Sequence, residues 1–213
     1  MFFFTRLCGY NLGDGSRQPL MTPVTEPHIH LWNRDEYYRL ADLNFFRGRR
    51  VELIEGQVID MAAMKSAHAI AIDWVDAALK PVFATGHYIR QQKPFVIGDR
   101  SEPEPDIAVV SGTIRDYTDA HPTTAVLIII EVADSSLRYD RKVKGSLYAK
   151  AGIAEYWIVN LNDHQLEVYS DPQVDTSSEY GFSYRRQQHY QTGQTVPLPE
   201  RAETAIAVGD LFP

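Results

Sequence analysis

Cysteine is nearly absent from this 213-residue sequence, which contains only Cys8. One thiol cannot close a disulfide within the chain, and it cannot supply the several thiolates of a cysteine-rich zinc site. A hydrophobic content of 44% is enough for one buried core, so the stability must come from packing. We expect a reducing, cytoplasmic setting, because chains without disulfides are typical of that compartment.

Long apolar runs are also missing. No stretch approaches the roughly 20 apolar residues that a membrane-spanning helix needs, so we expect no membrane contact. Met1–Phe4 is apolar but has neither a basic region nor a long apolar core, which argues against a signal peptide. Gly, Pro, Ser and Thr dominate residues 9–25. We expect a flexible tail over residues 1–25, with Met21 as an alternative start, and a single domain over residues 26–213.

Positive charge is in deficit, since the formal net charge is −7. Nucleic-acid-binding proteins usually carry a basic surface, so this charge weakens a model of simple electrostatic binding. Basic residues still gather at residues 47–50 and 138–144, where they are either solvated surface or part of a binding face. A bound cation would invert the local potential of an acidic site, so a metal-dependent enzyme stays open.

The most informative stretch is residues 105–148. Asp106 precedes a short apolar strand at residues 107–110, and a longer apolar run at residues 125–130 ends at Glu131. A run without polar alternation predicts a central strand that is covered on both faces. The pattern predicts an α/β fold in which helices flank a central mixed β-sheet.

A helix is predicted after Glu131, over residues 140–151, with Gly152 as the glycine that ends it. Asp140, Lys144 and Tyr148 are four residues apart and so share one face of this helix. That face can return a lysine to the strand ends that carry the acids.

Capping, turn and periodicity signals predict the remaining elements. They are helices over residues 33–43 and 66–83, a hairpin over 51–61 with its turn at 55–56, strands over 87–97, 154–159 and 165–170, a weaker strand over 182–190, and a strand or turn over 205–211. Tyr37, Leu40 and Ala41 are expected inward on the first helix, and Ile70, Trp74 and Ala78 on the second.

Metal-dependent phosphodiester hydrolysis needs carboxylates that hold Mg²⁺, a cation that offsets charge developing on the phosphate, and room for water and substrate. Asp106, Glu131 and Lys144 meet these needs, with Glu52 as a further carboxylate. Each residue also has a structural explanation, such as an acid at a strand end, a Pro-Asp turn, or an i,i+4 surface pair between Asp140 and Lys144. Their combination is what points to a site.

Six blocks follow one another along residues 51–169, namely Glu52-Leu53-Ile54-Glu55-Gly56 with Met61, His68, Pro105-Asp106-Ile107, Glu131-Val132-Ala133-Asp134-Ser135, the trio Asp140, Lys144 and Tyr148, and Ala151-Gly152-Ile153-Ala154-Glu155-Tyr156-Trp157-Ile158-Val159. Together they resemble the Uma-two family of restriction endonucleases, part of the PD-(D/E)XK nuclease superfamily. The last block is the most specific. The resemblance implies a restriction-endonuclease-like core.

The resemblance also implies site roles. Asp106 and Glu131 would be the metal-binding acids, with Mg²⁺ as the cofactor and Mn²⁺ as a substitute. Glu52 would be an extra acid that joins them. His68 lies in the first turn of the second helix, where a lone histidine is either a packing residue or a neighbour of the site.

The lysine departs from the superfamily pattern. It normally lies two residues after the second acid, but that position is Ala133 here. The family places the lysine on the following helix, so Lys144 is the expected catalytic lysine and Lys142 is the alternative. Asp140 and Tyr148 are expected either to orient Lys144 or to form a helix–sheet contact.

Three functions remain open at this point. The first is a Mg²⁺-dependent endonuclease that cuts nucleic acid, with DNA expected as the substrate in preference to RNA. The resemblance implies that it acts as a homodimer. The second is a catalytically silent nucleic-acid-binding or protein-binding module on a nuclease fold, which the negative charge and the missing lysine favour. The third is a metal phosphohydrolase that acts on nucleotides. Metal binding and activity on small phosphodiesters would distinguish them.

Overall fold

The structure is a computed structural model that describes residues 26–213, apart from Thr124, Glu200 and the side chain of Ala202. The chain divides into two units, residues 1–30 and residues 31–213, and every element described below belongs to the second. The tail expected over residues 1–25 lies outside the described residues. Within the described part of the chain, no helix combines the length and apolar character needed to cross a membrane.

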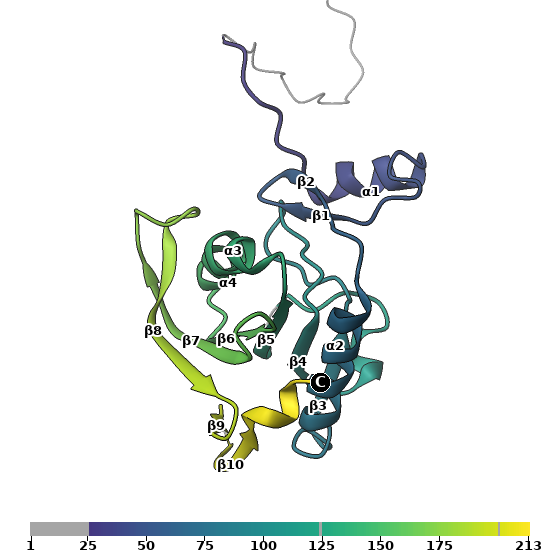
Figure 1. The fold of residues 1–213 in the computed structure, drawn as a ribbon. Coiled ribbons are helices and arrows are strands. Elements are labelled where there is room, and N and C mark those ends of the chain that lie inside the picture. The colour runs from purple at the N-terminus through teal and green to yellow at the C-terminus, as the bar shows by residue number, and fades with distance from the viewer. Residues whose placement is uncertain (1–25, 124, 200) are drawn as a thin grey trace, which may run out of the picture. The chain divides into compact units, whose positions relative to one another are not determined.

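A six-stranded sheet forms the centre of the second unit (Figure 1). Its strands, in sheet order, are His87–Gln91 (β3), Ile107–Ser111 (β4), Val126–Ala133 (β5), Glu155–Asn160 (β6), Gln165–Val174 (β7) and Phe182–Gln191 (β8). Strands β5 and β6 run parallel, and the other neighbouring pairs run antiparallel. The mixed sheet predicted from the sequence is confirmed.

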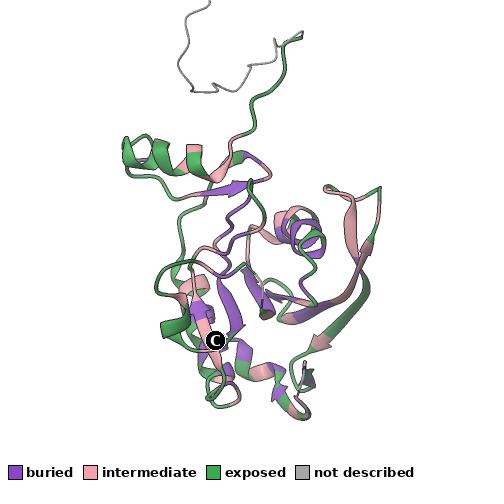
Figure 2. Ribbon diagram, turned by 180° about the vertical axis from the view of Figure 1, so that it is seen from behind, coloured by how far each residue is buried: buried purple, intermediate pink, exposed green. Residues whose placement is uncertain are grey.

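Helices cover both faces of this sheet, on opposite sides of β4 and β5 in Figure 1. On one face lies α2 (Ser66–Leu79). On the other lies one continuous helical segment made of α3 (Leu137–Tyr139), η2 (Asp140–Lys144) and α4 (Gly145–Lys150). The central strands are buried in consequence (Figure 2).

The two hydrophobic clusters are separated by the alternation of side chains along β5. Ile128 and Ile130 pack in the cluster that contains the buried face of α2, whereas Ile129 and Ala133 pack with α4. Glu131 has the same parity as Ile129 and Ala133, so its side chain points to the face covered by η2 and α4.

The remaining elements are short. They are α1 (Arg34–Asp42), the hairpin of β1 (Val51–Ile54) and β2 (Gln57–Asp60), η1 (Ile114–Tyr117), the pair of β9 (Thr195–Leu198) and β10 (Arg201–Ala207), and η3 (Val208–Leu211). Asn33 and Glu36 form the predicted capping box of α1. The predicted turn is also present, because Glu55 and Gly56 have φ values of 48° and 80°, as a two-residue hairpin turn with the twist of its strands requires.

The predicted inward residues of two helices were partly wrong. On α2, Ile70 and Trp74 are 45% and 47% exposed, and the buried face is instead carried by residues such as Ala71 and Val75. A small residue such as Ala71 lets the helix approach the sheet closely, which a pattern search for large apolar residues overlooks. On α1, Ala41 is exposed.

Three predicted boundaries also shifted. The strand expected over residues 87–97 ends at Gln91, because Gln92 takes a left-handed φ of 46° that breaks the extended backbone. The helix expected from Asp140 begins at Leu137 and includes the π-helical turn η2. The C-terminal region forms β10 and η3, and its partner β9 was not predicted.

Candidate active site

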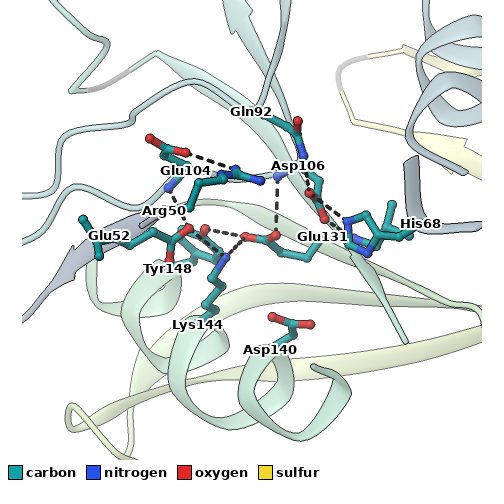
Figure 3. Close-up of polar contacts among 12 residues, drawn as sticks. Arg50, Glu52, His68, Gln92, Glu104, Asp106, Glu131, Asp140, Lys144 and Tyr148 are labelled. Atoms are coloured by element: carbon teal, nitrogen blue, oxygen red, sulfur yellow. Dashed lines mark hydrogen bonds and ion pairs between the residues drawn. The ribbon is translucent and has the colours of Figure 1, made fainter. Parts of the chain in front are cut away.

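Four separate elements bring the predicted site residues together (Figure 3). Glu52 comes from β1, Asp106 from the residue before β4, Glu131 from β5, and Lys144 from η2. All four are buried, with 0%, 8%, 3% and 2% of their surface exposed, so their charges must be neutralised by one another or by a ligand.

Strand pairing sets Asp106 beside Glu131. Ile107 pairs with Ile130 in the antiparallel β4–β5 ladder, so the next position along β5 lies opposite Asp106. The Asp106 backbone N–H donates to Glu131 Oε2 at 3.4 Å, and the Val132 N–H donates to Asp106 Oδ2 at 2.9 Å. The two carboxylates are therefore fixed by backbone contacts that flank them.

Glu52 reaches the same place because β1 lies against the segment before Asp106. The Glu102 N–H donates to Leu53 O at 2.7 Å, and the Glu104 N–H donates to Glu52 Oε1 at 3.0 Å. Glu52 Oε2 is buried and has no hydrogen-bond partner among the described residues.

Lys144 connects these acids. Its Nζ donates to Glu131 Oε1 at 2.9 Å and to Glu52 Oε1 at 3.3 Å. The Tyr148 hydroxyl, one helical turn further along, also donates to Glu131 Oε1 at 2.7 Å. Ala133, where the resemblance would have placed a lysine, is fully buried on the same face, and its small side chain packs in the cluster that contains Tyr148 and Ala149 of α4.

Burial and mutual charge move the pKa values of the cluster. Burial raises the pKa of Glu131 to about 8, although the positive charge of Lys144 acts in the opposite direction. Burial alone would lower the pKa of Lys144, but Glu131 and Glu52 outweigh it and raise that pKa. For Asp106, burial raises the pKa, yet the hydrogen bond from His68 and neighbouring positive charges leave it below its usual value.

Asp140 lies below this cluster in the view of Figure 3. It is 2% exposed, and burial raises its pKa to about 6. Its Oδ2 atom has no hydrogen-bond partner within the described residues. Tyr148 contacts Glu131 directly, so it supports an acid of the cluster as well as the helix that carries Lys144.

Two neighbours of Asp106 complete the polar network. His68 Nε2 donates to Asp106 Oδ1 at 3.1 Å, which raises the pKa of His68, and Gln92 Nε2 donates to the same oxygen at 3.3 Å. From the sequence, His68 was either a packing residue or a neighbour of the site, and the structure places it at the site. No pattern in the sequence indicated Gln92. Gln92 follows β3 directly, so its position depends on the pairing of β3 with β4, which only the folded sheet fixes.

A cavity of about 260 Å³ opens beside the cluster and is lined by Asp106, Glu131, Asp140 and Lys144 among others. The carboxylate oxygens of its lining residues are the kind of ligand that Mg²⁺ prefers. The Asp140 Oδ2 atom has no hydrogen-bond partner among the described residues, so it could coordinate a cation. The donor chemistry therefore fits the metal. In the described residues, however, no three acidic, histidine or cysteine side chains are already arranged to hold one. The acids are instead engaged by Lys144 and His68.

The fold and the cluster together define a mixed α/β protein with a carboxylate–lysine centre between β4, β5 and the helical segment that covers them. A family model described as "Putative restriction endonuclease" matches residues 34–208, so the chain belongs to this family, Uma2.

The fold is shared with solved structures, among them the crystal structure of "a putative nuclease" from Anabaena variabilis. The TM-score is 0.64, the sequence identity is 18%, and the match covers 85% of this chain and 97% of that chain. No curated protein matches this chain.

Proposed function

We propose that this chain is a Mg²⁺-dependent endonuclease that hydrolyses phosphodiester bonds in nucleic acid, with DNA as the first expected substrate. One observation carries the proposal: Asp106, Glu131 and Lys144 come from three elements to line one cavity, in a chain of a family described as restriction endonucleases. Buried groups with shifted pKa values in a cavity are typical of catalytic sites.

Asp106 and Glu131 would hold the metal, as in the PD-(D/E)XK pattern that the sequence resembles. Bound Mg²⁺ supplies Lewis-acid activation of water and charge stabilisation at the leaving oxygen. His68 and Gln92 hold the Asp106 carboxylate by hydrogen bonds to one oxygen, Oδ1. The Val132 N–H holds the other oxygen, so the carboxylate is fixed before substrate arrives.

Lys144 would offset the negative charge that develops on the phosphate, because Lys144 lines the same cavity. Glu52 binds the same ammonium group as Glu131, so it anchors Lys144, but Glu52 itself does not line the cavity. Metal binding by Glu52, which the resemblance implies, would require its buried Oε2 atom to become open to the cavity.

A silent binding module on the same fold is the second candidate. It is favoured by the engagement of Glu131 and Glu52 by Lys144 and by the lack, among the described residues, of a group of acids arranged for a metal. A titration with Mn²⁺ decides the matter, because a silent module would not bind the metal through Asp106 and Glu131.

Cleavage of supercoiled plasmid and circular single-stranded DNA tests the proposal directly. The protein with Mg²⁺ or Mn²⁺ should nick these substrates, and Asp106→Asn and Glu131→Gln should each abolish the nicking. Asp73→Asn is the matched control, because Asp73 is an exposed acid on α2 and does not line the cavity. Equal background cutting by all four proteins would refute nuclease action on DNA, and RNA and small phosphodiesters would then be tested.

The homodimer and the cytoplasmic setting remain predictions. Duplex cutting by two copies of one site predicts that sedimentation equilibrium at working concentration gives twice the monomer mass. A monomer with full cleavage activity would contradict the dimer prediction.

A further inference from the structure

Besides Lys144 and His68, two cationic side chains from separate segments line the cavity in the described part of the chain, namely Arg50, which precedes β1, and Lys65, which precedes α2. Lys144 is 2% exposed and is held between two carboxylates, so it cannot swing out to meet a nucleic-acid backbone. The side chains of Arg50 and Lys65 are 44% and 70% exposed, so they reach the solvent at the cavity mouth.

Each of these exposed cations is held by an acid that also lines the cavity. Arg50 Nη2 pairs with Glu104 Oε2 at 3.1 Å, and Lys65 Nζ pairs with Asp134 Oδ2 at 3.2 Å. Ion pairs that face water contribute little to stability, so a phosphate can replace the carboxylate at small cost. Glu104 would still be held by its backbone, because its N–H donates to Glu52.

Arg50 is the better placed of the two. It lies two residues before Glu52, and Glu52 is tied to Lys144, so the position of Arg50 is linked to that of the buried lysine. In the view of Figure 3 its guanidinium lies between Glu104 and the pair Asp106 and Glu131. A guanidinium has five donors in a planar fork that matches two phosphate oxygens, whereas one donor suffices for Glu104.

We propose that Arg50 and Lys65 bind backbone phosphates that flank the phosphodiester placed beside Asp106 and Glu131, with Arg50 as the stronger contact. This inference rests on the proposed function and names the part of the substrate that the cavity mouth holds. The protein has a net charge of −7, so its acids repel a nucleic-acid backbone. Arg50 and Lys65 would place positive charge at the mouth of the cavity, where the backbone must approach the buried acids.

The chain offers a matched control for each residue. Arg185, on β8, has a side chain that is 63% exposed and also pairs with an acid, Asp171, and neither of these two residues lines the cavity. Lys80 follows the other end of α2, is 66% exposed and pairs with Asp76, again away from the cavity. Loss of one positive charge is therefore the same in test and control variants.

The experiment measures binding of a fluorescent single-stranded oligonucleotide by anisotropy, in EDTA and in Mg²⁺, over a series of salt concentrations. Arg50→Gln should weaken binding about tenfold and Lys65→Gln about threefold, because each loses a charge-assisted contact to phosphate. The slope of log K against log salt should fall by about 0.7 for each lost contact. Arg50→Lys should keep the slope and recover part of the affinity, since it restores the charge without the fork.

Arg185→Gln and Lys80→Gln should bind like the unaltered protein, and circular dichroism should show that all five variants are folded. Equal weakening by Arg185→Gln and Arg50→Gln would overturn the inference, because general loss of charge would then explain both. Failure of the unaltered protein to bind in either condition would overturn it too.

Cleavage by the unaltered protein is scored separately on plasmid. If the unaltered protein cleaves plasmid but Arg50→Gln binds the oligonucleotide normally, the inference is wrong and the proposed nuclease function stands. If Arg50→Gln lowers the salt slope but the unaltered protein does not cleave, the inference stands and the protein is a binding module.

Discussion

At the scale of single residues, the identity of the lysine is the sharpest question. Lys144 contacts Glu131 and Glu52 and lines the cavity, whereas Lys142 is exposed and lines a different pocket, beside the β7–β8 hairpin. The two lysines are two positions apart on one helical segment and therefore point in different directions. The sequence gave Lys144 and Lys142 as candidates for the catalytic lysine, and the geometry favours Lys144.

Replacing Lys144 by methionine should lower the rate of DNA cleavage by about 10²–10³, the usual cost of removing one group that stabilises transition-state charge. Lys142→Met should cleave at the unaltered rate. Initial rates of plasmid nicking measure both, with circular dichroism to confirm that each variant is folded. Loss of activity in Lys142→Met with retention in Lys144→Met would reverse the assignment.

Another buried acid, Glu167, does not line the cavity, so it allows a test of buried electrostatics that is separate from catalysis. It is 0% exposed and accepts from both Arg141 Nε at 2.9 Å and Arg141 Nη2 at 2.5 Å, with further bonds from Tyr169 and Asn160. Burial acts to raise the pKa of Glu167, but the hydrogen bonds from Arg141, Tyr169 and Asn160 leave it below its usual value.

A carboxyl with a depressed pKa stabilises the folded state above its unfolded pKa, and this contribution is lost as pH falls through the folded pKa. Arg141→Met should therefore lower the free energy of unfolding by about 1–3 kcal/mol at pH 7. The deficit should shrink below about pH 4.5, where Glu167 becomes protonated in the variant and no longer buries a lone charge. Urea unfolding at pH 7 and pH 4 measures both values, and a deficit that is independent of pH would contradict the electrostatic explanation.

At the scale of elements, the helical segment from α3 to α4 decides whether the site forms. Its middle, η2, is a π-helical turn, and π turns are often found at functional sites. The segment ends at Gly152, whose φ of 73° is a left-handed conformation that side chains disfavour. Gly145, in contrast, opens α4 with an ordinary helical φ of −58°.

The two glycines should respond oppositely to alanine. A Cβ at Gly152 meets no atom within 4 Å, so Gly152→Ala should cost about 1 kcal/mol of stability from backbone strain alone. A Cβ at Gly145 meets Asp140 O at 3.4 Å and Tyr156 Cε1 at 3.7 Å, which are ordinary contacts. Gly145→Ala should therefore be neutral or stabilising by up to about 1 kcal/mol. Thermal unfolding compares them, and equal destabilisation would show that packing, not φ, controls both positions.

The sequence could predict what depends on local pattern. The apolar run of β5, the capping box of α1, the turn at Glu55-Gly56 and the terminating Gly152 each follow from a few neighbouring residues, and each is present. The acids and Lys144 could be named from the residue before β4, the end of an apolar run and a helical face, although Glu131 lies inside β5, which continues to Ala133, and not at the strand end expected from the sequence. The π turn, Gln92 and the pair of β9 and β10 depend on contacts between distant segments, so no local pattern indicates them.

At the scale of the whole molecule, the balance of charge limits how nucleic acid can approach. The net charge is −7, and three buried carboxylates line the cavity that a phosphate must enter. Without a cation there, phosphate and carboxylates repel each other at short range, where screening by salt is weak. The lysine and histidine contacts of the acids offset part of this repulsion within the protein.

Divalent metal should therefore strengthen nucleic-acid binding, not just cleavage. At constant ionic strength, Mg²⁺ or Mn²⁺ should raise the affinity for an oligonucleotide about tenfold over EDTA, because a bound cation inverts the potential of the acidic cavity. In Asp106→Asn combined with Glu131→Gln, binding in EDTA should be tighter than for the unaltered protein, since neither side chain can carry a charge that repels phosphate. The response to metal should vanish, because neither side chain can hold a cation. Metal should therefore strengthen binding by the unaltered protein but not by the double variant. General screening of charge would instead strengthen binding by both proteins equally. An unaltered protein that binds equally well in EDTA and in Mg²⁺ would place the backbone away from Asp106 and Glu131.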